Sequence, residues 1–503
     1  MRLLKLTLIA TLVLGLNTSC FEDQDDNAIS TSEINDFVWK AMNAVYLYKD
    51  GIPDLANDRF SSNEEYRTYL NGFSAPEDLF ESVIYERQTI DRFSVIVDDY
   101  IALEQQLSGI SKSNGMDFAL YRFTEADTDI FGVVRYVLPN TDAETKGIER
   151  GFIFNEVNGT QLTTTNWRNL LSPDNYTISL ANYNDNGTPE NINDDFLTPA
   201  DASISLTKTP YTENPIYTYD VLNVDGNNVG YLMYNGFTGT DQFDAQLNSV
   251  FGEFQAAGIT DLVLDLRYNG GGSVNTAIWL ASMITGQFTD ELFIREQWNS
   301  EIQAEFEANN PDALLNLFTD EIIKRNNNNE ITLQQSINHL NLSRLYVITT
   351  GSTASASELI INGLNPYIDV IKVGSTTVGK YQASTTIYDS PNFQRANANP
   401  RHTYAVQPLI FKSINSVGFT DYDNGFNPDV SIGERLNNLG ELGNPTEPLL
   451  AAAIMHIQGL GRFGDFPESV PMVSDSKDLL PFSKEMISND DLFYFTKSSL
   501  QSQ

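Results

Sequence analysis

The chain has 503 residues, of which 41% are hydrophobic and 11% aromatic, and its formal net charge at pH 7 is −37. This length predicts two or three domains, because a single hydrophobic core stops growing at about 250–300 residues. The acidic charge argues against binding to nucleic acid, whose phosphates require a basic surface, and against docking on anionic lipid head groups.

The first thirty residues resemble an export signal followed by a tether. Arg2 and Lys5 precede an apolar stretch that is too short to span a bilayer comfortably. Cys20 is the only cysteine of the chain, so the sequence cannot form an internal disulfide framework. Its position resembles that of the lipidated residue of a bacterial lipoprotein, which implies a signal peptide over 1–20, an acidic tether over 21–30 and a lipid anchor on Cys20. We therefore expect a lipoprotein of the bacterial cell envelope at the outer membrane, periplasmic or surface-exposed; an ordinary secretory peptide is the alternative.

Two regions with different patterns follow. Residues 31–104 show apolar side chains at helical spacing, among them Ile34 and Phe37, which predicts a helical N-terminal domain. Residues 105–212 contain short strand-like runs separated by turn residues, which predicts a β-rich domain. The helical region carries no cluster of side chains that suggests catalysis, so we expect the chemistry in residues 213–460.

A run of three glycines follows a predicted strand in that last region. The sequence from Asp265 to Gly272 predicts a strand end followed by a glycine loop. Consecutive glycines expose N–H donors and allow another group to approach the backbone closely. A phosphate-binding loop is the competing interpretation. It is disfavoured because the GxxxxGK[ST] pattern is missing and the net charge is acidic.

Ser355 stands where a predicted strand gives way to a predicted helix. The apolar run before Gly351 is typical of a buried strand, and helical spacing begins after Ser355, which would lie in the field of the helix N-terminus. Ser355 and Glu358 also fit a capping box, so a purely structural role is the alternative. As a nucleophile, a serine hydroxyl needs a neighbouring base.

The sequence favours a lysine over a histidine as that base. The three histidines, His339, His402 and His456, lie in no recognisable catalytic context. No HExxH zinc motif is present, and we expect neither a metal nor a cofactor. A lysine can act as a base only when it is neutral, so its pKa must fall from about 10.4 to about 7–8, and burial would lower it.

Three motifs occur together in one order: Asp265–Gly272, the Ala-Ser-Ala-Ser-Glu segment around Ser355, and a Gly-Lys pair that ends at Lys380, 25 positions after Ser355. This combination resembles the carboxyl-terminal processing, or tail-specific, family of serine–lysine peptidases over most of the chain. The resemblance implies that Ser355 is the nucleophile and Lys380 its general base. Ser352 and Ser357 are alternatives, but the spacing to the lysine favours Ser355.

The resemblance also implies an oxyanion hole and leaves the third catalytic residue open. The candidate donors are the amides of Ala356, Gly270, Gly271 and Gly272. The possible auxiliary side chains are Glu358, Ser384 and Gln382. We interpret Glu358 as a cap or an auxiliary group, because an ionised carboxylate beside Lys380 would keep the amine charged.

The fold implied by the resemblance is a multidomain α/β and α+β structure. It consists of the helical N-terminal domain over 31–104, a PDZ-like domain over 105–212, a crotonase-like (ClpP/crotonase-type) α/β catalytic core over 213–460 and a C-terminal tail over 461–503. In the PDZ-like domain, Gly115, Met116, Asp117 and Phe118 would bind a peptide carboxylate. The alternative is a PDZ-shaped module that gates the site without binding peptide. We expect the tail to lie on the surface or to be loosely ordered.

The function implied is that of a serine endopeptidase. It would cleave exported or unfolded proteins near their C-termini through an acyl-enzyme on Ser355, with protein or peptide substrates as partners. The alternative is a noncatalytic ligand- or peptide-binding lipoprotein on the same scaffold. An intact pair of Ser355 and Lys380 favours the enzyme, because a pure binder has no need of both residues together.

Overall fold

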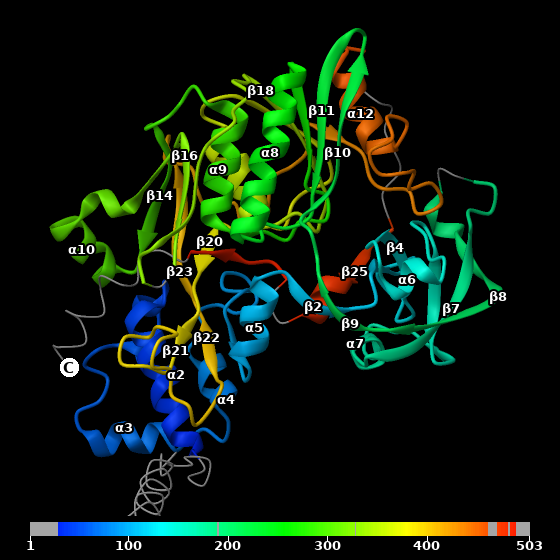
Figure 1. The fold of residues 1–503 in the computed structure, drawn as a ribbon. Helices are drawn as coiled ribbons and strands as arrows, with labels where there is room; N and C mark the ends of the chain where they lie inside the picture. Colours follow the sequence, from blue (N-terminus) through cyan, green and yellow to red (C-terminus); the bar gives the residue numbers. More distant parts are fainter. Residues whose placement is uncertain (1–28, 189–190, 327, 461–469, 481–482, 489–503) are drawn as a thin grey trace, which may run out of the picture.

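The computed structural model describes residues 29–188, 191–326, 328–460, 470–480 and 483–488 (Figure 1). The predicted signal peptide and the lipid anchor on Cys20 lie outside the described residues. Within the described part of the chain, no helix combines the length and the apolar character that a membrane crossing requires. The predicted mixed α/β multidomain organisation is confirmed.

The N-terminal region is helical, as the apolar spacing predicts. Its first helix begins at a capping box between Ser30 and Glu33 and buries Phe37, Val38 and Met42. The elements are α2 (Thr31–Val45), α3 (Asn63–Leu70), α4 (Pro76–Ser82), β1 (Val95–Val97) and α5 (Tyr100–Leu107). Strand β1 pairs antiparallel with β22 (Ala405–Gln407), which pairs with β21 (Ile387–Tyr388), so a hairpin from much later in the sequence joins this region.

The region 105–212 contributes most of an antiparallel sheet with the strand order β25-β3-β4-β5-β7-β8. Its elements are β2 (Ile110–Ser113), β3 (Met116–Tyr121), β4 (Phe131–Val137), α6 (Asp142–Thr145), β5 (Ile153–Val157), β6 (Thr160–Gln161), α7 (Trp167–Leu171), β7 (Asn175–Asn184), β8 (Phe196–Thr207) and β9 (Thr209–Thr212). The edge strand β25 (Met472–Asp475) comes from the C-terminal part of the chain and pairs antiparallel with β3. Every residue of β3 is buried, because each face of the strand packs in an apolar cluster: Met116, Phe118 and Leu120 in one, Ala119 and Tyr121 in the other.

A six-stranded sheet has the order β10-β11-β12-β18-β19-β24, and its strands are parallel from β11 onward. The strands are β10 (Ile216–Val224), β11 (Asn227–Tyr234), β12 (Asp261–Asp265), β18 (Arg344–Thr349), β19 (Asp369–Gly374) and β24 (Val430–Ser431). Alternate side chains of β11, β12 and β18 pack on α8 (Asp241–Ala257), α9 (Val274–Thr285) and α11 (Ala356–Leu364), or on α12 (Pro448–Ile457) at the opposite face (Figure 1). Burial on both faces explains why these strands are continuously apolar in sequence.

A second six-stranded sheet, with the order β13-β26-β20-β23-β14-β15, contacts α11 through β14 and β23. Its strands are β13 (Gly272–Ser273), β26 (Met486–Ile487), β20 (Gln382–Ser384), β23 (Leu409–Asn415), β14 (Leu292–Trp298) and β15 (Leu315–Leu317). The segment between α9 and β18 also contributes α10 (Ser300–Asn309) and the hairpin of β16 (Glu321–Arg325) and β17 (Ile331–Ser336).

The C-terminal segment differs from the prediction of a surface tail. Its described residues contribute the edge strand β25 to one sheet and the inner strand β26 to another. Met486 is fully buried in the main core cluster. The apolar runs of this segment are only a few residues long, so they show no periodicity from which burial could be predicted.

Candidate active site

Ser355 occupies a strained turn between β18 and α11. It is the N-cap residue of α11, with φ 65° and ψ −117°, a conformation that costs a non-glycine residue about 1–3 kcal/mol. The side chain is fully buried, and its Oγ has no hydrogen-bond partner among the described residues. Ser355 and Glu358 have the positions of a capping box, but only the Ser355 main-chain N–H is bonded, to Glu358 Oε2 at 2.9 Å. The hydroxyl is therefore available for another role.

The carboxylate of Glu358 joins the backbone of Ser355 to the backbone of Lys380. It accepts the main-chain N–H groups of Ser355 at 2.9 Å, of Gly379 at 2.7 Å and of Lys380 at 2.8 Å. Thr377 Oγ1 donates to it as well, at 2.5 Å. Burial raises the pKa of Glu358, and these four donors oppose that change. Glu358 thus meets Lys380 at its main chain, and the Lys380 amine has other partners.

The side chain of Lys380 is fully buried beside the C-terminal segment. Its Nζ donates to the carbonyl oxygen of Lys484 at 2.7 Å and to Glu485 Oε2 at 2.8 Å, and it lies 4.9 Å from the centroid of the Phe93 ring. Burial lowers the pKa of Lys380, and Glu485 offsets part of this effect. Burial likewise raises the pKa of Glu485. Both shifts favour the uncharged form of the group concerned, which a lysine base requires.

The glycine loop lies directly beside Ser355. A side chain at Gly271, where φ is 110°, would meet Ser355 Oγ at 2.9 Å and the Glu485 carbonyl oxygen at 2.5 Å. The Gly272 N–H donates to that same carbonyl oxygen, with 2.5 Å between nitrogen and oxygen. The Gly271 N–H donates to Asn269 Oδ1 at 2.8 Å. Among the predicted oxyanion donors, the Gly272 amide is the one directed at a carbonyl oxygen beside the serine.

Ala356 is the first residue of α11, and Gly270 borders the C-terminal segment. The amides of the first helical turn have no intrahelical acceptor, which suits the predicted role of Ala356. A side chain at Gly270 would come within 1.9 Å of the Ser483 carbonyl oxygen. The glycines at 270 and 271 therefore permit both the approach of the segment and the approach of Ser355.

A buried ionic cluster supports the glycine loop, and sequence reasoning missed it. Arg267 is fully buried and pairs with Asp265 at 2.7 Å and with Glu447 at 2.7 and 2.9 Å. Thr350 Oγ1, just before the serine turn, donates to the Arg267 carbonyl oxygen. The cluster thereby links the strand ends that carry the two loops. Arg267 belongs to the Asp265–Gly272 motif, so its charge next to Asp265 was the available signal.

The other predicted serines have partners elsewhere. Ser357 Oγ donates to the Asn269 carbonyl oxygen at 3.1 Å. Ser352 Oγ donates to Asp475 Oδ2 at 2.8 Å. Of the possible auxiliary residues, Ser384 Oγ donates to Glu485 Oε2 at 2.7 Å, whereas Gln382 Nε2 donates to Tyr48 OH at 2.8 Å. Ser384 therefore shares a partner with Lys380, and Gln382 does not.

The histidines lie outside this cluster. His402 Nε2 is 2.9 Å from Asp389 Oδ2, and His456 Nδ1 is 3.2 Å from Tyr346 OH. The imidazole of His339 packs against Gly286.

The run from Gly115 to Phe118, predicted to bind a peptide carboxylate, begins β3. Its amides are already engaged: the Gly115 N–H donates to Ser113 Oγ at 2.9 Å and the Met116 N–H to Asn114 Oδ1 at 3.0 Å. The Phe118 N–H donates to Ser476 Oγ in the C-terminal segment at 3.3 Å. The side chain of Asp117 pairs with Arg135 at 2.5 Å.

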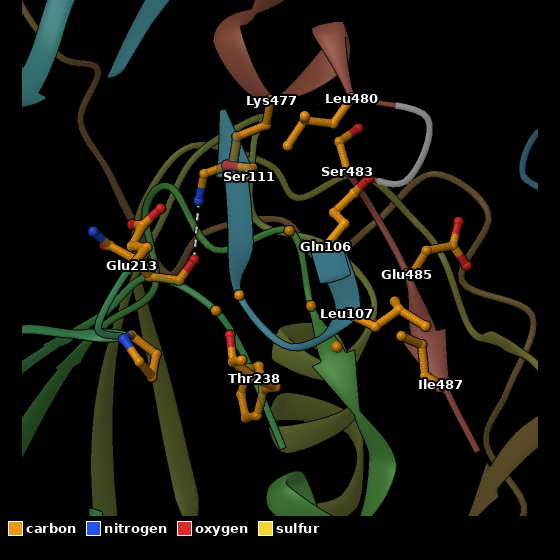
Figure 2. A pocket seen from close by; sticks show the side chains of 18 residues that line it. Gln106, Leu107, Ser111, Glu213, Thr238, Lys477, Leu480, Ser483, Glu485 and Ile487 are labelled. Carbon is orange, nitrogen blue, oxygen red and sulfur yellow. Dashed lines mark hydrogen bonds between the residues drawn. The ribbon is translucent and has the colours of Figure 1, made fainter. Parts of the chain in front are cut away.

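A cavity of about 160 Å³ opens beside the glycine loop (Figure 2). The cavity is lined by α5, β2, the stretch 213–238, the three glycines and the C-terminal segment. The lining residues include Leu107, Glu213, Thr238, Lys477, Ser483 and Glu485. Glu485 lines this cavity and also contacts Lys380. The segment therefore stands between the cavity and the lysine.

Two family models match parts of the chain. Residues 228–404 match the model of Peptidase family S41, and residues 33–95 match that of the Peptidase S41 N-terminal domain. None of the curated proteins compared with the chain matches it.

Solved structures align with the chain over most of its length. A protein of Bacteroides fragilis assigned to the S41 proteases is 25% identical, with a TM-score of 0.61, and the alignment covers 84% of this chain and 97% of that chain. The photosystem II D1 C-terminal processing protease is 19% identical, with a TM-score of 0.47, over 82% of this chain and 95% of that chain. The predicted resemblance is confirmed: residues 33–95 and 228–404 match the models of peptidase family S41, a family of serine-type peptidases, and the chain resembles a solved structure assigned to that family over most of its length.

Proposed function

We propose that the protein is a serine endopeptidase in which Ser355 is the nucleophile and Lys380 is the general base. The observation that carries this proposal is the Glu358 carboxylate, which accepts the main-chain N–H groups of both residues. It ties a buried, unpartnered hydroxyl to a buried lysine whose pKa is lowered by burial. Backbone strain at Ser355 supports the same role, since such strain clusters at functional sites.

In the reaction, neutral Lys380 takes the proton of Ser355 Oγ while Oγ forms a bond to the substrate carbonyl carbon. The negative charge on the carbonyl oxygen is stabilised by backbone amides, with Gly272 and Ala356 as donors, each contributing about 3–4 kcal/mol. Collapse of the intermediate breaks the C–N bond, and the departing amine takes the proton from Lys380. Water then hydrolyses the acyl-enzyme, with Lys380 again accepting and returning a proton.

The substrates are proteins or peptides, as the family implies, and we propose that they are exported or unfolded chains cleaved near their C-termini. In this proposal residues 105–212 act as a PDZ-like module, because the extended segment β25 adds to one side of β3 as a strand. The catalytic core is of the crotonase-like kind. The lipid anchor on Cys20 and the location in the bacterial envelope are proposed from the sequence pattern alone.

The test compares the mature protein with Ser355→Ala and Lys380→Ala on an unfolded polypeptide with a free C-terminus, with the products identified by mass spectrometry. Both variants should lose cleavage while their thermal unfolding stays cooperative. Ser357→Ala is the matched control, because it removes a neighbouring hydroxyl and should retain activity. Undiminished cleavage by Ser355→Ala would refute the assignment, and selective loss in Ser357→Ala would move the nucleophile to that residue.

A further inference from the structure

The described C-terminal segment, residues 470–480 and 483–488, runs from the β3 sheet to the glycine loop (Figure 1). It adds to β3 in antiparallel register, with Met472 opposite Tyr121 and Asp475 opposite Ala119. It then adds as β26 to β13 and β20, parallel to both. The segment thus binds by strand addition at two successive places, which is a recurring mode of peptide recognition.

A charged contact anchors the segment where it leaves β3. Asp475 is buried, accepts from Ser352 Oγ at 2.8 Å and lies 3.4 Å from Arg135 Nη1. Burial opposes ionisation of Asp475, but Arg135, Lys484, Ser352 and Lys477 together outweigh it, and the pKa of Asp475 falls to about 2. Arg135 also pairs with Asp117 of β3. Asp475 therefore connects the β3 sheet to Ser352, three residues before the candidate nucleophile.

Further along, the segment contacts the main chain around the glycine loop. Lys477 Nζ donates to the carbonyl oxygens of Asn235 and Tyr268, at 3.0 and 2.8 Å. The Glu485 carbonyl oxygen accepts the Gly272 N–H and lies on the same side of Gly271 as Ser355 Oγ.

The Glu485 side chain completes this arrangement. Its carboxylate accepts from Lys380 Nζ at 2.8 Å and from Ser384 Oγ at 2.7 Å, and the Lys484 carbonyl oxygen accepts from the same Nζ at 2.7 Å. The two groups that the proposed reaction uses, the Lys380 amine and the Gly272 N–H, are thus engaged by atoms of the chain itself.

We propose that this segment is an intramolecular ligand of the peptide-binding track and inhibits the enzyme until it dissociates. The inference rests on the proposed function, because it assigns an occupant to the same site. The track takes an extended polypeptide that adds antiparallel to β3, continues toward the glycine loop and presents a carbonyl oxygen to the Gly272 N–H. A substrate chain of this direction competes with the segment for the same donors.

The experiment uses the full chain with Glu485→Ala or Asp475→Ala, and Glu64→Ala, an exposed carboxylate on α3, as the matched control. Two rates are measured: labelling of Ser355 by a fluorophosphonate and hydrolysis of an internally quenched peptide. We expect both rates to rise by at least about tenfold in the first two variants, because truncating one partner of a buried hydrogen-bonded pair mainly speeds dissociation. Glu64→Ala should behave like the unmodified chain.

A second measurement follows the segment directly. Hydrogen exchange of the amides of Gly272 and of residues 472–475 should be faster in Glu485→Ala than in the unmodified chain, with thermal unfolding still cooperative. A synthetic peptide covering residues 470–488 should slow labelling of Glu485→Ala, and the same peptide carrying Glu485→Ala should slow it less.

The outcomes separate the two proposals. If Ser355 is labelled but Glu485→Ala leaves labelling and hydrolysis unchanged or lowers them, the inhibitory role is wrong, and a loss would make Glu485 a positioning residue for Lys380. If no variant is labelled or active, the proposed function fails. Faster hydrogen exchange in Glu485→Ala would then still support the segment as a releasable ligand, and unchanged exchange would overturn it.

Discussion

Lys380 Nζ lies 2.8 Å from Glu485 Oε2, across 105 residues of sequence. Both side chains are buried, and burial lowers the pKa of the lysine and raises that of the glutamate. The environment that prepares Lys380 to act as a base therefore also reduces the charge carried by its partner. Because the pKa of Lys380 is lowered and that of Glu485 is raised, the two side chains can be buried together without the large cost of desolvating two full charges.

The pH dependence of turnover should report this pairing. A base is active when unprotonated, so activity should rise with pH along a limb whose apparent pKa lies below the ordinary lysine value of about 10.4. Glu485 raises the pKa of Lys380 against the effect of burial, so Glu485→Ala should move the limb to lower pH. The measurement is kcat/KM across the alkaline range, with Glu64→Ala as control; a limb that stays in place or moves upward would contradict the pairing.

The strain at Ser355 predicts a separation of stability from activity. Ser355→Ala and Ser355→Gly should both be inactive, because each lacks the hydroxyl. Glycine adopts φ 65° and ψ −117° without a steric cost, whereas alanine retains it. We expect Ser355→Gly to have a free energy of unfolding higher than that of Ser355→Ala by about 1 kcal/mol, after allowance for the greater freedom of glycine in the unfolded chain. Denaturant unfolding checks this; equal stabilities would mean that the turn relaxes without cost.

Local patterns were sufficient to predict the order of elements around the site. A strand end followed by three glycines, and a strand followed by Ser355 and a helix, both fold as the sequence indicates. Gly351 and Ser355 mark the turn because an apolar run stops there and helical spacing begins.

The contacts made by the C-terminal segment could not be predicted in this way. Neither Glu485 nor Asp475 belongs to a motif, and their partners Lys380 and Arg135 are 105 and 340 residues away. Strand β26 has only two residues, and its burial depends on the gap that β13 and β20 leave between them. Such placement depends on tertiary packing, which local periodicity does not encode.

The Glu358 carboxylate predicts a defect in positioning when its charge is removed. Glu358→Gln keeps the shape but turns an amide NH₂ toward donors that now face a carboxylate, so at least one buried N–H or O–H loses its acceptor. We expect a loss of about 1–3 kcal/mol in the free energy of unfolding. We also expect kcat to fall about 100-fold with little change in KM, because Ser355 and Lys380 shift relative to each other.

The matched control for that substitution is Glu33→Gln. Glu33 occupies the corresponding capping-box position of α2, at the surface. Glu33→Gln should lower the free energy of unfolding by less than about 1 kcal/mol and leave kcat unchanged. If Glu358→Gln behaves like Glu33→Gln in both measurements, Glu358 is an ordinary helix cap.

The close approach of Gly271 to Ser355 gives the last prediction. A methyl group at this position would come within 2.6 Å of Ser355 Cβ and 2.5 Å of the Glu485 carbonyl oxygen, and φ is 110°. Gly271→Ala should therefore lower kcat by at least about 100-fold, because the serine or the adjacent amides must move. Gly147→Ala controls for backbone strain, since Gly147 has φ 72° and no atom within 4 Å of the added methyl group.

Gly147→Ala should lower stability by only about 1–2 kcal/mol and leave turnover intact. The contrast between the two variants isolates steric contact with Ser355 from the conformational cost that they share. Steady-state kinetics together with thermal unfolding distinguish the two effects. If Gly271→Ala retained full turnover, the loop could not lie against the nucleophile during catalysis, and the Gly272 N–H would lose its place as a hydrogen-bond donor to the developing oxyanion.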